Sequence, residues 1–267
     1  HVRFTVAGDS LTAEATDLDQ TAICRFDNAG ADGEGDILVP FTLLKELTRG
    51  GGAEAVTFEN AGAALTITSD AGGRAVRRTA EGADPADWPQ SGPAIPTAEA
   101  AGFLAAYRRT APFASKDETR RVLQGVFIDA SGAGDRNATL VATDGRRLTC
   151  CNSLKLHLGD RDGVIVPVTR FLLWGGLPAE ARLGVSGGRD GARVCVQAGR
   201  WTYRVKAVDG LYPNWRQVIP SADGMPHRML RTELVEEIEG TGRLRRMVPT
   251  ARRTLEFKRM SGMSWKQ

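Results

Sequence analysis

The chain has 267 residues, of which 42% are apolar and 25% are charged, and this composition excludes collagen-like and disordered proteins. No apolar run approaches the ~20 residues of a membrane-spanning helix, and a net charge of +3 is compatible with a nucleic-acid partner but too small to identify one. Four scattered cysteines form neither a disulfide framework nor a CxxC metal spacing, so we expect a reducing, cytoplasmic setting with no membrane and no metal ion.

The first predicted elements are strands followed by a short helix. Five stretches along the chain alternate apolar and polar residues as half-buried strands do, at 2–6, 56–58, 64–68, 193–196 and 202–205. Between the first two, Pro40 stands where a first helical turn tolerates proline. Leu43, Leu44 and Leu47 share one face of this helix, and the glycines at 50–52 end it.

A second helix is predicted over residues 97–109. Its apolar residues follow the i, i+3, i+4, i+7 spacing of a buried stripe, at Ala100, Phe103, Leu104 and Tyr107. A third, shorter helix is expected at 167–174, between a proline and two glycines. Strands interspersed with a few helices predict an α+β layered domain.

Internal similarity is the most informative feature of the sequence. Three short motifs recur in the same order: Ala-Thr-Asp at 15–17 and 142–144, Val-Pro at 39–40 and 166–167, and an aromatic residue followed by proline at 88–89 and 212–213. The first two recur after 127 residues and the third after 124. The sequence therefore predicts a domain-sized repeat that the chain enters midway. Its second copy opens at 95–110 and its third at 228–246.

Basic residues lie on the predicted exposed helix faces. Lys45 and Arg49 lie opposite the leucine face, Arg109 lies opposite the apolar stripe with Arg108 at its flank, and the third-copy helix ends in Arg243 and Arg246. Basic residues also favour helix C-termini and solvent, which explains any one of them without a function. The functional interpretation is one shared surface that neutralises phosphates without reading bases.

Three segments of the second copy resemble a known family. KDETRRVLQGV at 116–126, LVATDGRRL at 140–148 and GLYPNWRQVIP at 210–220 are similar in order and spacing to the middle domain of the bacterial DNA polymerase III β subunit, the sliding clamp. The first copy is similar to that family's first domain, through ATDLD at 15–19 and DWP at 87–89.

The resemblance implies tandem DNA-clamp domains of α+β class, with antiparallel sheets outside and paired helices lining an inner face. Residues 1–93 would be an N-terminally incomplete first domain, 94–220 a complete second and 221–267 the opening of a third. A fragment or interrupted gene product, omitted segments and an authentic short clamp each fit this pattern. In the last case, residues 228–259 could complete the first domain of a neighbouring chain, and three chains would form a six-domain ring.

The resemblance also implies a function without catalysis. Family members encircle duplex DNA as homo-oligomeric rings and tether the polymerase. The partners implied are double-stranded DNA of any sequence, the polymerase III catalytic subunit, the clamp loader, other proteins with a clamp-binding motif and further copies of the chain. The place implied is the cytoplasm, at the nucleoid, and no cofactor is implied. The DNA-facing residues expected are Lys45, Arg49, Arg108, Arg109, Arg120, Arg121, Arg243 and Arg246.

A peptide-binding cleft is implied beside the middle domain. The positions that match the family's cleft are Leu123, Thr143, Gly145, Arg147, Leu148, Pro213 and Val218. Four of these are apolar and suit a pocket, while a glycine allows a peptide backbone to approach closely. Arg146 stands where the family often has histidine, and Gln217 where arginine is frequent. Without the family, the Thr-Asp-Gly sequence would be interpreted as a simple strand-ending turn.

Two other function classes are alternatives to a clamp that encircles DNA. A clamp-like interaction module would hold peptide partners without closing on DNA. An enzyme has little support, because His1, His157 and His227 form no catalytic or metal-binding motif and the sequence contains neither a P-loop nor GxSxG. The glycines between 187 and 191 are typical of a turn between strands.

Overall fold

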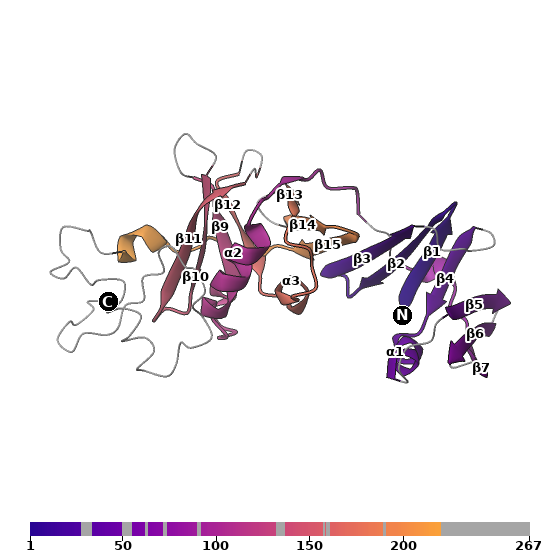
Figure 1. Ribbon diagram of the computed structural model, residues 1–267. Coiled ribbons are helices and arrows are strands. Elements are labelled where there is room, and N and C mark those ends of the chain that lie inside the picture. Colours follow the sequence, from indigo (N-terminus) through magenta and orange to yellow (C-terminus); the bar gives the residue numbers. More distant parts are fainter. Residues whose placement is uncertain are drawn as a thin grey trace, which may run out of the picture. The chain divides into compact units, whose positions relative to one another are not determined.

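The computed structural model describes residues 1–27, 34–49, 55–61, 64–71, 74–89, 92–131, 137–156, 158, 161–188 and 191–219 (Figure 1). These residues form two compact units. Unit 1 contains His1–Ala101 and Trp174–Ala207, and unit 2 contains Gly102–Leu173 and the chain from Val208 onward. The expectations for residues 221–267, including Arg243, Arg246 and the segment 228–259, lie outside the described residues.

Neither a membrane helix nor a metal cluster is found in this part of the protein. No helix of the described ranges is long and apolar enough to cross a membrane. The same ranges contain no group of three or more His, Cys, Asp or Glu residues placed to hold a metal ion.

The predicted repeat is visible as two series of elements in the same order. The first series is β1 (Val2–Ala7), β2 (Ser10–Thr16), β3 (Gln20–Asp27), β4 (Gly35–Val39), α1 (Phe41–Arg49), β5 (Ala55–Ala61), β6 (Ala64–Ala71), β7 (Arg74–Glu81) and the 3₁₀ turn η1 (Pro85–Asp87). The second is β9 (Gly125–Asp129), β10 (Asn137–Thr143), β11 (Leu148–Lys155), β12 (Gly163–Pro167), α3 (Arg170–Leu173), β13 (Arg182–Ser186), β14 (Arg193–Ala198), β15 (Trp201–Lys206) and η4 (Trp215–Val218). Strands β2 and β10 both have seven residues, and they begin at 10 and 137, the predicted 127 residues apart.

Four further elements precede or open the second series: β8 (Ala98–Glu99), α2 (Phe103–Thr110), η2 (Ala111–Phe113) and η3 (Arg121–Leu123). The helix predicted over 97–109 therefore begins six residues late. Its first residues are extended because Ala98 and Glu99 pair with β13, and Gly102, at φ +76°, turns the chain into the helix. The helix expected at 167–174 is a single turn.

The sheets repeat as well. The order β4-β1-β2-β3 matches β12-β9-β10-β11, and β5-β6-β7 matches β13-β14-β15, to which β8 adds an edge strand. All pairings are antiparallel, as the α+β prediction requires. Strand β3 also pairs with β15, so strands from both repeats form one eight-stranded sheet within unit 1.

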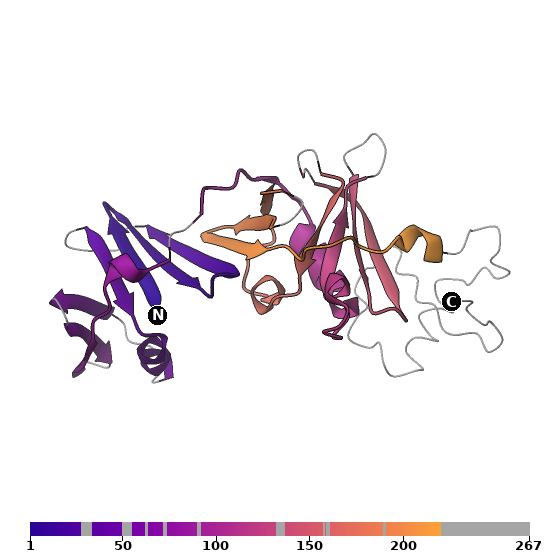
Figure 2. The same ribbon diagram turned by 180° about the vertical axis from the view of Figure 1, so that it is seen from behind.

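In unit 2 the predicted apolar stripe forms the core. Helix α2 lies against β10, β11 and α3 (Figure 1). Its Phe103, Leu104 and Tyr107 are completely buried. The Tyr107 hydroxyl donates a hydrogen bond of 2.6 Å to the carbonyl of Pro167. The opposite face of the sheet is crossed by residues 208–218, which lie in front of it in Figure 2. The β9–β12 sheet is thus covered on both faces.

In unit 1 the leucine face of α1 packs as predicted. Leu43, Leu44 and Leu47 lie against a core of Val39, Leu65 and Ile67. The β1–β3 sheet is less covered than its counterpart in unit 2. Val2 pairs with Val39 as Val126 pairs with Val166, but Val2 is only half-buried whereas Val126 is fully buried.

Candidate functional site

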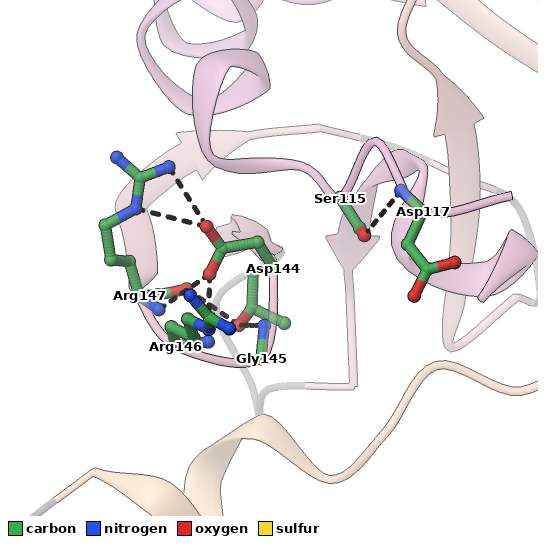
Figure 3. Close-up of polar contacts among 7 residues, drawn as sticks. Ser115, Asp117, Asp144, Gly145, Arg146 and Arg147 are labelled. Atoms are coloured by element: carbon green, nitrogen blue, oxygen red, sulfur yellow. Dashed lines mark hydrogen bonds and ion pairs between the residues drawn. The ribbon is translucent and has the colours of Figure 1, made fainter. Parts of the chain in front are cut away.

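The turn between β10 and β11 is the best-defined part of the predicted cleft. One carboxylate oxygen of Asp144, Oδ1, accepts hydrogen bonds from the backbone N–H groups of Arg146 (2.9 Å) and Arg147 (2.8 Å) (Figure 3). Thr143 Oγ1 donates to the carbonyl of Arg147 (2.7 Å) and accepts from the N–H of Gly145 (3.0 Å). Gly145 has φ +85°, in the left-handed region that glycine adopts without strain. The turn is therefore fixed by its own side chains.

The same turn closes the β2–β3 hairpin. Asp17 Oδ1 accepts from the N–H groups of Asp19 (3.2 Å) and Gln20 (2.8 Å), and Thr16 repeats both bonds of Thr143. Leu18 takes the place of the glycine, at φ +77°. The Thr-Asp pair thus encodes the turn in both repeats, and only the second repeat adds glycine and two arginines.

Arg147 is held in place on two sides. Its Nε and Nη2 atoms donate to Asp144 Oδ2 at 3.1 and 3.0 Å (Figure 3), and its guanidinium lies over the ring of Phe113 at 5.4 Å. The side chain nevertheless remains 59% exposed. A guanidinium that is hydrogen-bonded through two nitrogens to one carboxylate oxygen and stacked on a ring has a defined direction, and it keeps free donor capacity for a ligand.

Ionisation of Asp144 supports the turn. Burial alone would raise the pKa of this carboxyl, but the hydrogen bonds from the Arg147 and Arg146 backbone and the Arg147 guanidinium outweigh it and lower the pKa below its ordinary value. At neutral pH Asp144 is therefore charged, as the geometry requires.

The loop before η3 lies against this turn. Arg120 pairs with Asp117 at 3.6 Å, and a Cβ atom added to Gly145 would come within 2.9 Å of the Arg120 guanidinium. Asp117 donates its N–H to Ser115 Oγ at 3.1 Å (Figure 3). Arg120, expected on the DNA side, thus lies beside the predicted cleft, together with the exposed Arg146.

The segment 208–218, which we call the strap, brings Pro213 to the same region. Val208 donates its N–H to the carbonyl of Ile165 (2.9 Å), and the Tyr212 ring stacks on Phe127 with centroids 4.8 Å apart and planes at 9°. Burial raises the pKa of Tyr212 to about 12. A Cβ atom added to Gly210 would come within 2.7 Å of the Val122 side chain, so the strap also passes close to η3.

A buried carboxylate holds the end of the strap. Asp129 is 3% exposed, and its Oδ2 accepts from Trp215 Nε1 and Arg216 Nη1, both at 2.7 Å. Its Oδ1 accepts from the N–H (3.0 Å) and the hydroxyl (2.6 Å) of Ser131. Burial alone would raise the pKa of Asp129, but these hydrogen bonds outweigh it and the pKa is lowered.

The predicted cleft residues thus lie on three neighbouring segments of unit 2. Thr143, Gly145 and Arg147 share the turn, Leu148 follows it half-buried, Leu123 is buried in η3, and Pro213 and the 51% exposed Val218 lie on the strap. Sequence reasoning assigned no site role to Phe113, Asp129, Asp144 and Tyr212. The repeat of Ala-Thr-Asp was the signal for Asp144, whereas the other three are recognised only from tertiary contacts.

The predicted helix cations differ in their surroundings. Lys45 on α1 and Arg109 on α2 are exposed, and Arg121 is exposed in η3. Arg108 is half-buried and donates from Nε to the carbonyl of Leu172 at 3.2 Å, so it also caps α3. Arg49 belongs to α1. Arg170, the first residue of α3, is a further exposed cation that the prediction omitted.

Comparisons with known proteins agree with the resemblance seen in the sequence. The chain matches no protein-family model. It is 25% identical over 251 residues to the beta sliding clamp of Chlamydia muridarum, a match that covers 88% of this chain and 63% of the relative. A stretch of 43 residues is 51% identical to the (3aS,4S,5R,7aS)-5-hydroxy-7a-methyl-1-oxo-octahydro-1H-indene-4-carboxyl-CoA dehydrogenase of Rhodococcus jostii. It covers only 16% of this chain and 12% of that enzyme, too little to transfer an activity.

Solved structures show the fold. The DNA polymerase III subunit beta of Pseudomonas aeruginosa matches with a TM-score of 0.66 and 24% identity, over 83% of this chain and 61% of that one. The Helicobacter pylori beta clamp bound to a DNA ligase peptide matches with a TM-score of 0.69 and 20% identity, over 82% and 61%. The described residues therefore have the sliding-clamp fold, and the chain spans less than two thirds of the clamps it matches.

Proposed function

We propose that this chain is a DNA sliding clamp, a processivity factor that encircles duplex DNA and tethers the replicative polymerase. The observation that carries the proposal is the repeat: two copies of the clamp-domain element order, in a chain whose match to sliding clamps spans more than four fifths of its length. In this proposal 1–93 and 94–220 are the first two clamp domains and 221–267 opens a third. The protein has no catalytic role or cofactor and acts in the cytoplasm as a ring-forming homo-oligomer, with a clamp loader.

Sequence-independent contact with DNA is part of the proposal. The exposed Lys45, Arg109 and Arg170 lie on three helices, and exposed cations neutralise phosphates without reading base edges. A ring bound in this way is retained by topology instead of affinity.

Topological retention is the direct test of a ring. Full-length protein assembled on nicked circular plasmid should stay bound in a high-salt wash, and linearising the plasmid should release it. Equal loss from circular and linear DNA would contradict encirclement. The second candidate function, a clamp-like module that binds partner peptides without closing on DNA, would then remain. The observation that favours it is that the described residues of the cleft all lie in unit 2.

We further propose that the cleft binds short peptide motifs of polymerases and repair proteins. The fixed Arg147 guanidinium, the bare backbone of Gly145 and the apolar Leu123, Leu148, Pro213 and Val218 support this. A peptide from DNA ligase is bound to the Helicobacter pylori clamp of the same fold.

Substitutions in the cleft test peptide binding. Pro213→Asp and Leu148→Asp should each weaken binding of a fluorescein-labelled, Gln-Leu-rich clamp-binding peptide at least about tenfold, because each places a charge in an apolar pocket. Leu18→Asp is the matched control, since it adds the same charge at an exposed position of the equivalent turn in the first repeat. Unchanged affinity in folded Pro213→Asp and Leu148→Asp proteins would remove these residues from the site.

A further inference from the structure

The side chains of strand β9 point alternately to the two faces of its sheet. Val126 and Ile128 are fully buried on the face that α2 covers, where Ile128 pairs with Leu140. Phe127 and Asp129 alternate with them and contact Tyr212 and Trp215 of the strap. The strap is therefore attached to a single strand by two side chains, one aromatic and one acidic.

The contact between Tyr212 and Phe127 depends on a glycine in the neighbouring strand β12. Gly163 pairs with Asp129, and a Cβ atom at this position would come within 2.6 Å of the Phe127 ring. The glycine thus leaves the space in which Phe127 lies flat under Tyr212. This contact fixes the strap on the N-terminal side of Pro213.

The acidic attachment fixes the strap on the other side. Trp215 is 8% exposed, and the Arg216 guanidinium stacks on its ring at 4.6 Å. A single carboxylate oxygen, Asp129 Oδ2, accepts hydrogen bonds from both of these adjacent strap residues. Because Asp129 is itself buried, losing these donors would leave a desolvated charge, which is unfavourable. Backbone hydrogen bonds within the 3₁₀ turn η4 and to the carbonyl of Ile165 add to these two attachments.

We infer that Asp129 is a positioning residue for peptide binding. It does not touch the peptide. It fixes Trp215 and Arg216, and so sets the positions of Pro213 before them and Val218 after them, which form the strap side of the cleft. This inference rests on the proposed peptide-binding function, and it assigns a role to a residue outside the family-matched cleft positions.

Two variants of the full chain separate positioning from general stability. Asp129→Asn removes the negative charge. It also replaces one carboxylate oxygen, which accepts two hydrogen bonds, with an NH2 group that cannot accept any. Trp215→Phe keeps an aromatic ring but removes its N–H donor, which makes it the milder variant if Asp129→Asn folds poorly. Asp36→Asn is the matched control, because it breaks another partly buried ion pair, to Arg3 at 2.8 Å, in unit 1.

The readouts are peptide affinity and local order of the strap. The dissociation constant of the Gln-Leu-rich peptide should rise about tenfold in Asp129→Asn and about threefold in Trp215→Phe, and stay unchanged in Asp36→Asn. Amide hydrogen exchange should accelerate at Gln217 and Ile219, which donate to Asn214 and Arg216 within η4, while α2 and β10 keep their protection.

The outcomes distinguish this inference from the proposed function. If the wild-type protein and folded Asp129→Asn bind the peptide with equal affinity, the positioning role is overturned and the clamp proposal stays intact. A faster-exchanging strap with unchanged affinity would do the same. Absence of peptide binding by the wild-type protein would overturn the peptide-binding function itself, and the positioning role with it.

Discussion

Leu18 and Gly145 occupy the same position of two equivalent turns, both with positive φ. For leucine this conformation is strained by about 1 kcal/mol, because its Cβ approaches the following carbonyl. Backbone N–H groups of the turn donate hydrogen bonds to the Thr16 and Asp17 side chains, and these bonds hold the turn despite this strain. Leu18 is also 66% exposed, so packing offers no compensation.

Opposite substitutions at these positions should have opposite effects. Leu18→Gly should stabilise the protein by up to about 1 kcal/mol by relieving strain, partly offset by the greater freedom of glycine in the unfolded chain. Gly145→Ala should destabilise it by about 1 kcal/mol or more. Chemical denaturation measures both, and destabilisation by Leu18→Gly would show that the leucine makes a contact that matters more than its φ.

The lowered pKa of Asp144 predicts how the stability of the protein changes in acid. Its pKa is lowered in the folded protein, so its contribution to stability is present above the ordinary carboxyl pKa of about 4 and is lost as pH falls through the lower folded value. The stability difference between wild type and Asp144→Asn should therefore be constant from about pH 5 to 8 and shrink below about pH 4. Thermal denaturation across this range measures it, and a difference independent of pH would show that the charge is unimportant.

Among the elements, helix faces were predicted better than element ends. The apolar stripe of α2 and the leucine face of α1 are buried as their spacing indicates, because a helix face is set by local periodicity. The start of α2 was wrong because Ala98 and Glu99 pair with β13, more than 80 residues away. In the site, the Thr-Asp-Gly turn was predictable, whereas Asp129 was not, since its partners Trp215 and Arg216 join it only through the tertiary fold.

Replacing valine with alanine should lower the free energy of unfolding by different amounts in equivalent strands of the two repeats. Val126→Ala should cost about 2 kcal/mol, because Val126 is fully buried in unit 2 beneath α2. Val2→Ala, at the equivalent position of the half-covered β1–β3 sheet, should cost less than about 1 kcal/mol. Urea denaturation of both variants measures the difference, and equal losses would show that the two faces are equally well packed.

For the whole molecule, the proposed DNA contact has an electrostatic signature. Lys45→Glu and Arg109→Glu should each weaken duplex association and reduce the slope of log K against log salt by about 1, since fewer counterions are released. Arg25→Glu is the control: Arg25 is a 66% exposed cation on strand β3 instead of a helix, and its reversal should leave the slope unchanged. A wild-type slope in the Lys45 and Arg109 variants would remove α1 and α2 from the DNA surface.

The pairing of β3 with β15 has a consequence for dissecting this protein. The proposed boundary between the two repeats, near residue 93, separates strands that belong to the same eight-stranded sheet of unit 1. A fragment cut there would present Gln20–Cys24 as a bare strand edge, with the five pairings to β15 lost, and such edges recruit other chains. The repeat boundary is therefore a poor guide to where the polypeptide can be divided, and a fragment of the N-terminal hundred residues should also keep Trp174–Ala207.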